Sequence, residues 1–211
     1  HCNDDGGKLT MRSYENNKFP NLNHLEPELK LFFAYLPTDS MLDGELYNHD
    51  MLFNEIVSAV KTVKRVHPKV SKIQYHIFDI YCPNNVDNLP FENRINMLND
   101  AYNLYCQDYK IPTTFLIVKT VKANNHTEVI NQHDSYAKDG YEGAFIKKLS
   151  NNSKVDTVTY KQSLYKAGKS MHILKLKYFI DEEADIIGVT EGEGTEKGLA
   201  VLIVRDIRNN E

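Results

Sequence analysis

The pattern of apolar and polar positions divides the chain into short strands and a few helices. Apolar residues recur at helical spacing over residues 50–66, which predicts an amphipathic helix that ends before Pro68. Further helices are expected over residues 27–34, 90–105 and 127–138. The last of these is expected to be capped by Thr127 and stopped by Gly140.

Alternation of apolar and polar residues predicts the strands. The turn-forming run from Asn3 to Lys8 precedes an alternating stretch at 9–13, which indicates the returning strand of a hairpin. Within a strand over 72–81, four residues are expected to share one face: Ile73, Tyr75, Ile77 and Asp79. Other strands are expected at 41–47, 115–121, 144–148, 173–179, 184–189 and 199–205. Many strands with few helices in mixed order predict an α+β fold with antiparallel sheets.

The composition is that of a soluble globular protein. With 211 residues, of which 41% are hydrophobic and 26% charged, the chain can bury the core of one large domain. Its three cysteines lack the spacing of a zinc or redox pair and are expected to be free thiols. No apolar run approaches the roughly 18 residues that span a bilayer, and the N-terminus lacks a signal-peptide layout. We therefore expect an intracellular protein of the cytoplasm or nucleus, and its richness in Asn, Lys and Ile is compatible with an AT-rich, viral genome.

The formal net charge of −4 gives no overall basic footprint, so any contact with DNA must be local. The candidate basic patches are Lys147 with Lys148, and the series Lys166, Lys169, Lys175 and Lys177. A third cluster, Lys61, Lys64 and Arg65, is better explained as the solvated face of a helix.

Four short motifs follow one another along the chain. They are Asp43-Gly44-Glu45, Phe78-Asp79, Glu142-Gly143 followed by Phe145-Ile146-Lys147, and Lys175-Leu176-Lys177. Two carboxylates on either side of a glycine, on an apolar strand, are suited to binding the ribose of a nucleotide. Two lysines on one strand face repel each other mildly unless an anion lies between them. Each motif alone has a plain structural explanation, such as a turn, a core phenylalanine or a guarded strand edge, so the information is in their order.

In that order the motifs resemble those of the covalent nucleotidyltransferases, and among them the ATP-dependent DNA ligases. The resemblance covers nearly the whole chain and implies a nucleotidyltransferase (adenylation) domain of antiparallel sheets with flanking helices. It implies that Glu45 binds the ribose, that Phe78 stacks on the base, and that Glu142 helps to hold the metal. It further implies catalytic, phosphate-binding roles for Lys175 and Lys177, with ATP and Mg²⁺ as cofactors.

Two more segments resemble parts of the family that hold DNA. Thr10-Met11-Arg12-Ser13 resembles a short ligase motif whose arginine grips the 5′-phosphate of a nick, which makes Arg12 the candidate. Residues 165–170 resemble a segment that usually carries an arginine where Lys169 stands. A lysine there keeps the charge but loses the bidentate fork of arginine. The resemblance thus implies nicked duplex DNA as the partner of an enzyme that we expect to be monomeric.

The defining Lys-x-Asp-Gly motif of the family, whose lysine becomes attached to the nucleotide, does not occur in this sequence. We expect it to lie before His1, because Asn3-Asp4-Asp5-Gly6 has asparagine at the position of the nucleophile. Residues 181–187 and 191–194 resemble the passage from the nucleotidyltransferase domain into a ligase OB-fold. We therefore expect an adenylation domain at 1–182 and the beginning of an incomplete OB-fold at 183–211, a chain that alone neither binds ATP covalently nor seals DNA.

The interpretation that the sequence favours is an ATP-dependent DNA ligase that seals 5′-phosphate/3′-hydroxyl nicks through lysyl-AMP and DNA-adenylate intermediates. An mRNA capping guanylyltransferase shares several of the motifs, but it usually has aspartate where Glu142 stands. An RNA ligase is a further alternative. A catalytically inactive nucleotide- or DNA-binding module is the alternative from another class.

Overall fold

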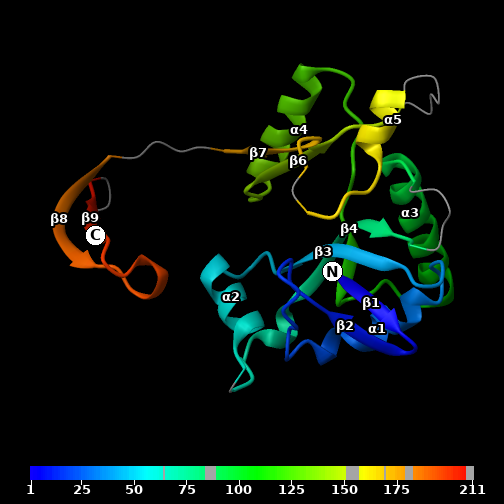
Figure 1. Ribbon diagram of the computed structural model, residues 1–211, viewed down its shortest axis with the longest axis horizontal. Helices are drawn as coiled ribbons and strands as arrows, with labels where there is room; N and C mark the ends of the chain where they lie inside the picture. Colours follow the sequence, from blue (N-terminus) through cyan, green and yellow to red (C-terminus); the bar gives the residue numbers. More distant parts are fainter. Residues whose placement is uncertain (64, 84–88, 151–156, 169, 179–182, 208–211) are drawn as a thin grey trace. The chain divides into compact units, whose positions relative to one another are not determined.

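The computed structural model describes residues 1–63, 65–83, 89–150, 157–168, 170–178 and 183–207 (Figure 1). The chain divides into two compact units. The first comprises His1–Ile130 and Phe145–Lys175, and the second comprises Asn131–Ala144 and Leu176–Glu211. Among the described residues, no helix is both long and apolar enough to cross a membrane.

A five-stranded sheet with the order β2-β1-β3-β4-β5 forms the centre of the first unit. Its strands are β1 (Cys2–Asp5), β2 (Lys8–Met11), β3 (Met41–Tyr47), β4 (Gln74–Tyr81) and β5 (Phe115–Ile117). Neighbouring strands are antiparallel except β4 and β5, which are parallel. The fold is therefore α+β, as predicted, with one parallel pair at the sheet edge.

The first hairpin turns at Gly6 and Gly7, whose φ angles of 64° and 88° are those that a two-residue turn between twisted strands requires. The turn is shorter than predicted, because Asn3 to Asp5 already belong to β1. The amide of Gly7 also donates to the Asp4 carboxylate, with an N–O distance of 2.7 Å. The glycine pair thus fixes the register that joins β1 to β2.

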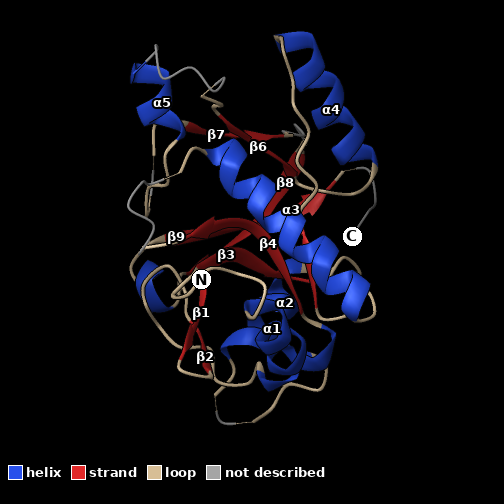
Figure 2. Ribbon diagram, turned by 90° about the vertical axis from the view of Figure 1, so that its right-hand side faces the viewer, coloured by secondary structure: helices blue, strands red, loops and turns tan. Residues whose placement is uncertain are grey.

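Three helices of the first unit surround this sheet: α1 (Glu26–Phe33), α2 (Phe53–Lys61) and α3 (Phe91–Asp108). Helix α3 packs against β4 and β5 and also contacts α1 (Figure 2). Phe32 of α1, Tyr105 of α3 and Phe115 of β5 meet ring to ring, with centroids 4.9–5.9 Å apart. These rings form part of a continuous apolar core that also takes in the buried residues of β3 and β4.

The remaining described elements lie outside the five-stranded sheet and the three helices named above. They are the 3₁₀ helices η1 (Asn23–Leu25), η2 (Val70–Lys72) and η3 (Gly194–Glu196), the helices α4 (His126–Lys138) and α5 (Thr157–Ser163), and the strands β6 (Gly143–Lys147), β7 (Ile173–Lys177), β8 (Ala184–Glu191) and β9 (Ala200–Asp206). Strands β6 and β7 form one two-stranded sheet, and β8 and β9 form another.

The predicted helices and strands are present, with differences at their ends. Helix α4 is capped by Asn125 rather than Thr127, because the Asn125 side chain accepts the amide of Glu128 at 2.9 Å. It ends at Lys138, as predicted, two residues before Gly140, whose φ is 86°. Helix α5 and strand β1 were not predicted, and the polar loop expected at 151–154 lies outside the described residues.

A β-bulge in β4 corrects one prediction that matters for the site. The pairing of β3 with β4 passes from Asp43 opposite Asp79 to Gly44 opposite Ile77, which leaves Phe78 as an extra residue. Ile77 is fully buried in the core. Asp79 was expected on the face of Ile77, but the bulge turns it to the opposite face, together with Phe78.

Gly44 is required at this point by close packing. A Cβ on Gly44 would come within 2.6 Å of both the His76 carbonyl oxygen and the ring of Tyr75. That ring is fully buried, and its hydroxyl donates to the Leu42 carbonyl oxygen at 2.7 Å. The glycine of the Asp-Gly-Glu motif therefore makes room for a core tyrosine beneath the face that carries the two carboxylates.

Candidate active site

The non-core face of β3 and β4 carries the residues predicted to bind the ribose and the base of the nucleotide. Glu45 is exposed and lies directly opposite His76, and cross-strand neighbours of this kind have Cβ atoms roughly 5 Å apart. Phe78, two residues beyond His76 and half-buried, lies at the bulge. The residues predicted for ribose and base thus sit on adjacent strands of one sheet.

Asp79 beside Phe78 is the centre of a buried charge cluster. Arg94 of α3 binds its carboxylate with two nitrogens, at 2.7 and 3.0 Å, and Lys147 of β6 adds a third contact at 2.8 Å. Asp79 and Arg94 are each only 4% exposed. Bidentate contacts of this type are the strong, geometrically specific form of ion pair. The cluster therefore joins β4, α3 and β6 rigidly.

Electrostatics keep Asp79 ionised. Its burial acts to raise the pKa, but the hydrogen bonds from Arg94 and the positive charges of Lys147 and Arg94 prevail, and the pKa of Asp79 is lowered. The Lys147 ammonium also lies 4.4 Å from the ring centroid of Phe91 and 5.4 Å from that of Phe78. Lys147 was predicted as part of a basic surface patch, and it is instead committed to this internal cluster.

Asp43, directly opposite Asp79, has a separate partner. The hydroxyl of Tyr165 donates to its carboxylate at 2.6 Å, and the Tyr165 ring stacks on Tyr81 with centroids 4.7 Å apart. Burial raises the pKa of Asp43, an effect that the hydrogen bond from Tyr165 opposes and the charge of Asp79 reinforces. Burial and the hydrogen bond to Asp43 also raise the pKa of Tyr165, so its phenol stays protonated and able to donate.

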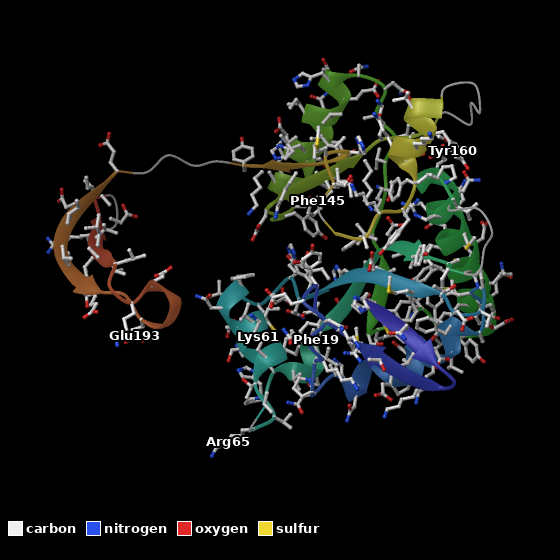
Figure 3. All side chains as sticks on the ribbon, viewed as in Figure 1. Phe19, Lys61, Arg65, Phe145, Tyr160 and Glu193 are labelled. Carbon is white, nitrogen blue, oxygen red and sulfur yellow. The ribbon has the colours of Figure 1, made fainter. Side chains whose placement is uncertain are left out.

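The two lysines of β7 have different neighbours. The Lys175 ammonium lies 5.4 Å from the ring centroid of Phe145, which is 60% exposed on β6 (Figure 3). In the second unit, Lys177 pairs with Glu142 at 3.1 Å, and the two side chains are 43% and 71% exposed. The structure thus brings together two residues that were assigned separately, Glu142 for the metal and Lys177 for the phosphates.

Of the two DNA-phosphate candidates, the structure describes Arg12. Arg12 follows β2, forms an isolated bridge with Lys18, and donates to the Asn16 carbonyl oxygen at 3.1 Å. Lys169 lies outside the described residues.

No group of three or more metal-ligating side chains occurs within the part of the chain that the structure describes. Mg²⁺ does not need one, because it commonly keeps several waters and binds through one carboxylate together with phosphate oxygens. Glu142 offers such a carboxylate, exposed and paired with a single lysine. The donor set therefore fits a metal that arrives with the nucleotide.

Two members of the site, Arg94 and Tyr165, were not predicted as functional residues. The signal for Arg94 was present, because it falls at helical spacing among the buried positions Phe91, Leu98 and Ala101 of α3. A charge on the apolar face of a helix needs a buried partner. For Tyr165, no local pattern indicates that its hydroxyl reaches a carboxylate 122 positions earlier in the chain.

Known proteins similar to this chain are DNA ligases. The profile of the family described as ATP dependent DNA ligase domain matches residues 1–177. The DNA ligase of African swine fever virus, in the Pretoriuskop tick isolate, is 24% identical over 209 residues, covering 99% of this chain and 46% of the relative. The ligase of the Namibian warthog isolate has the same identity and coverage. The chain spans about half the length of the curated relatives it matches.

Two solved structures share the fold. One, from a structure-function analysis of Lig E DNA ligases, has a TM-score of 0.62 and 24% identity, covering 98% of this chain and 70% of that chain. The other, described as Pmar-Lig_PreS3, has a TM-score of 0.70 and 19% identity, covering 98% and 46%. The family profile matches from the first residue to Lys177, which includes the five-stranded sheet, the Asp79 cluster and the two lysines of β7. The chain therefore belongs to the family of ATP-dependent DNA ligase domains.

Proposed function

We propose that this chain provides the nucleotide-binding part of an ATP-dependent DNA ligase that seals 5′-phosphate/3′-hydroxyl nicks in duplex DNA. The supporting observation is the bulge in β4, which puts Phe78 on the same face of the sheet as the exposed carboxylate of Glu45. An aromatic ring beside a hydrogen-bonding carboxylate suits a base and its ribose. The proposed sequence of reactions is formation of lysyl-AMP, transfer of AMP to the 5′-phosphate, and displacement of AMP by the 3′-hydroxyl.

The proposed roles follow from the position and chemistry of each side chain. Phe78 stacks on the adenine, and Glu45 accepts hydrogen bonds from the ribose. Lys175 and Lys177 offset the charge that develops on the phosphates. Glu142 holds Mg²⁺, which when bound neutralises phosphate charge and orients the phosphates.

On the DNA side, we propose that Arg12 and Lys169 bind the 5′-phosphate of the nick. Arginine can engage two phosphate oxygens at once, whereas lysine acts as a point charge. The contacts that Arg12 makes to Asn16 and Lys18 hold its backbone at the end of β2 and orient its guanidinium. Phosphate contacts of this kind position the enzyme on the duplex without reading its sequence.

The organisation of the chain is proposed along the same lines. Residues 1–182 form the nucleotidyltransferase domain, and residues 183–211 begin an OB-fold. The antiparallel hairpin of β8 and β9 supports the second assignment, because it pairs over its whole length and exposes apolar side chains on both strands, as an incomplete barrel would. We propose that the enzyme acts as an intracellular monomer in DNA replication or repair.

The intact mass of the full-length gene product, before and after incubation with ATP or GTP and magnesium, tests the proposal. An increase by one AMP with ATP alone, followed by loss of that AMP on addition of nicked DNA, is the expected result. An increase by one GMP would instead indicate a capping guanylyltransferase. No adduct with either nucleotide, for a protein that still binds ATP, would indicate an inactive binding module.

Substrate choice separates the two kinds of ligase. The adenylated protein should seal a nicked DNA duplex in preference to a nick of the same sequence made in RNA. A Phe78→Ala variant offers a matched check of the base-binding role, because it removes the ring but leaves the Asp79 cluster in place. It should weaken ATP binding, and unchanged ATP affinity would remove Phe78 from the proposed site.

A further inference from the structure

The segment that follows α5 is held at several points by groups of the nucleotide-binding sheet and α3. The backbone of Leu164 bridges to that of Pro90, and the carbonyl oxygen of Ser163 accepts from Arg94 at 3.1 Å. The next residue, Tyr165, is bonded to Asp43 through its hydroxyl and stacks on Tyr81 through its ring. The guanidinium of Arg94 also lies over the Tyr165 ring, 5.5 Å from its centroid.

From Tyr165 the chain runs directly to Gly168 and on toward Lys169. Gly168 has a φ of 87°, and a Cβ built on it would lie 2.9 Å from the hydroxyl oxygen of Tyr14. Tyr14 is two residues after Arg12. Residues 165–168, which precede the proposed DNA-phosphate ligand Lys169 in the sequence, therefore reach the loop that carries Arg12, although more than 150 positions separate them from that loop.

Tyr165 is also tied to the nucleotide side. Its hydrogen-bond acceptor, Asp43, lies in β3 only two positions before Glu45, and alternate residues of a strand share a face. One tyrosine thus links the strand proposed to grip the ribose with the segment proposed to grip the DNA phosphate. AMP transfer requires the phosphate of AMP and the 5′-phosphate of the DNA to meet, with their reacting atoms about 3 Å apart.

We propose that Tyr165 is a positioning residue for the transfer of AMP to DNA: by bonding Asp43 and stacking on Tyr81, it fixes residues 165–168 so that Lys166 and Arg12 converge on one 5′-phosphate beside the bound nucleotide. The inference rests on the proposed ligase function. In this proposal Tyr165 does not contact the substrate, and it acts through the segment that follows it.

The direct test is Tyr165→Phe, which keeps the ring and its stack on Tyr81 and removes only the hydroxyl. Self-adenylation with ATP and AMP transfer from the adenylated enzyme to nicked DNA are measured separately, each in a single turnover. The rate of self-adenylation should stay within about twofold of wild type. The rate of AMP transfer should fall by about tenfold to a hundredfold, the range expected for loss of a hydrogen bond to a charged group.

A second variant tests the partner. Asp43→Ala removes the acceptor, and the double variant with Tyr165→Phe should transfer AMP no more slowly than the slower of the two single variants, because both remove the same bond. Asp43→Asn retains an oxygen that can accept from the phenol and should recover most of the loss seen with Asp43→Ala. Tyr160→Phe, a matched change on the neighbouring helix α5 (Figure 3), should leave both steps unchanged.

Three other outcomes of these measurements would each overturn the inference. AMP transfer by Tyr165→Phe at the wild-type rate would show that the hydroxyl does not position the segment. Equal losses in both steps, accompanied by a lower melting temperature, would show a purely structural role. If the wild-type protein forms no AMP adduct, the proposed function itself fails, and the inference fails with it.

Discussion

Arg94 offers the most direct test of how the site is built, because Arg94→Met keeps an unbranched apolar stem and removes the charged guanidinium. In the folded protein, the carboxylate of Asp79, which is 4% exposed, would then keep the ammonium of Lys147 and the amide of Ile80 as partners but lose its bidentate contact. The carbonyl oxygens of Leu89 and Ser163 would also lose a donor. Removing one member of a buried ion pair typically costs about 3–5 kcal/mol, and we expect the free energy of unfolding to fall by that amount. For a domain stable by about 5–15 kcal/mol, this is a large fraction.

The pH dependence identifies the cause of the loss. A carboxyl whose pKa is lowered on folding contributes stability above its unfolded pKa of about 3.9, and this contribution is lost as the pH falls through the folded pKa. In Arg94→Met, the arginine that lowers the pKa of Asp79 is gone, while burial still raises it. The gap in stability between wild type and variant should therefore be largest near pH 7 and narrow toward pH 4 and below.

Urea unfolding followed by circular dichroism, at several pH values between 7 and 3.5, measures this gap. Asp79→Asn combined with Arg94→Met should be more stable than Arg94→Met alone, because the uncompensated buried carboxylate is the costly species. A loss below about 1 kcal/mol at pH 7, or a gap that does not change with pH, would refute the reasoning.

Three further predictions concern the site. In the full-length protein, Glu142→Ala and Lys175→Ala should each reduce self-adenylation by at least about tenfold, by removing metal or phosphate contacts, and near-normal adenylation in either would exclude that residue. Arg12→Ala should spare adenylation and slow AMP transfer to nicked DNA, so a loss confined to adenylation would contradict its role. Gly44→Ala should destabilise the protein by about 2–3 kcal/mol in urea unfolding, since the added methyl meets a carbonyl oxygen at 2.6 Å, and an unchanged midpoint would contradict this packing.

Local patterns were sufficient for the positions of the main helices and strands, because each element buries one face against the core. The hairpin of β1 and β2 follows from Gly6 and Gly7, and the end of α4 follows from Gly140, since these glycines adopt positive φ angles that other residues avoid. The order of the motifs was likewise enough to indicate the ligase family, which the family profile confirms.

The face on which Asp79 lies could not be predicted from alternation. A bulge shifts the register by one residue, and a shift of one residue moves every later side chain to the other face of the sheet. The sequence Ile77-Phe78-Asp79-Ile80 contains no glycine or proline that would indicate a bulge. The register shift falls between Asp43 and Gly44 of the partner strand, where Gly44 leaves room for the ring of Tyr75.

The motifs could be recognised from the sequence, but the partners of their charged residues could not be predicted from local patterns. Alternation along one strand indicates which side chains share its face, but the partners of a lysine come from other elements. Lys147 belongs to the predicted motif, yet its ammonium binds Asp79, which is 68 positions away in the chain. Arg94 completes that cluster from a helix that carries none of the ligase motifs.

The ion pairs of the two units differ in what it costs to break them, and this difference bears on the role proposed for each pair. The contact of Lys147 with Asp79 is nearly dry, with side chains 15% and 5% exposed, so separating these charges would leave them poorly solvated. The pair of Lys177 with Glu142 is largely open to water, and exposed pairs of this kind contribute about 0–1 kcal/mol. If Glu142 and Lys177 have the roles proposed for them, a magnesium nucleotide would exchange their contact for a carboxylate–metal and an ammonium–phosphate contact at little cost. Within the first unit, the Asp79 cluster would stay intact and keep the backbone beside Phe78 in place.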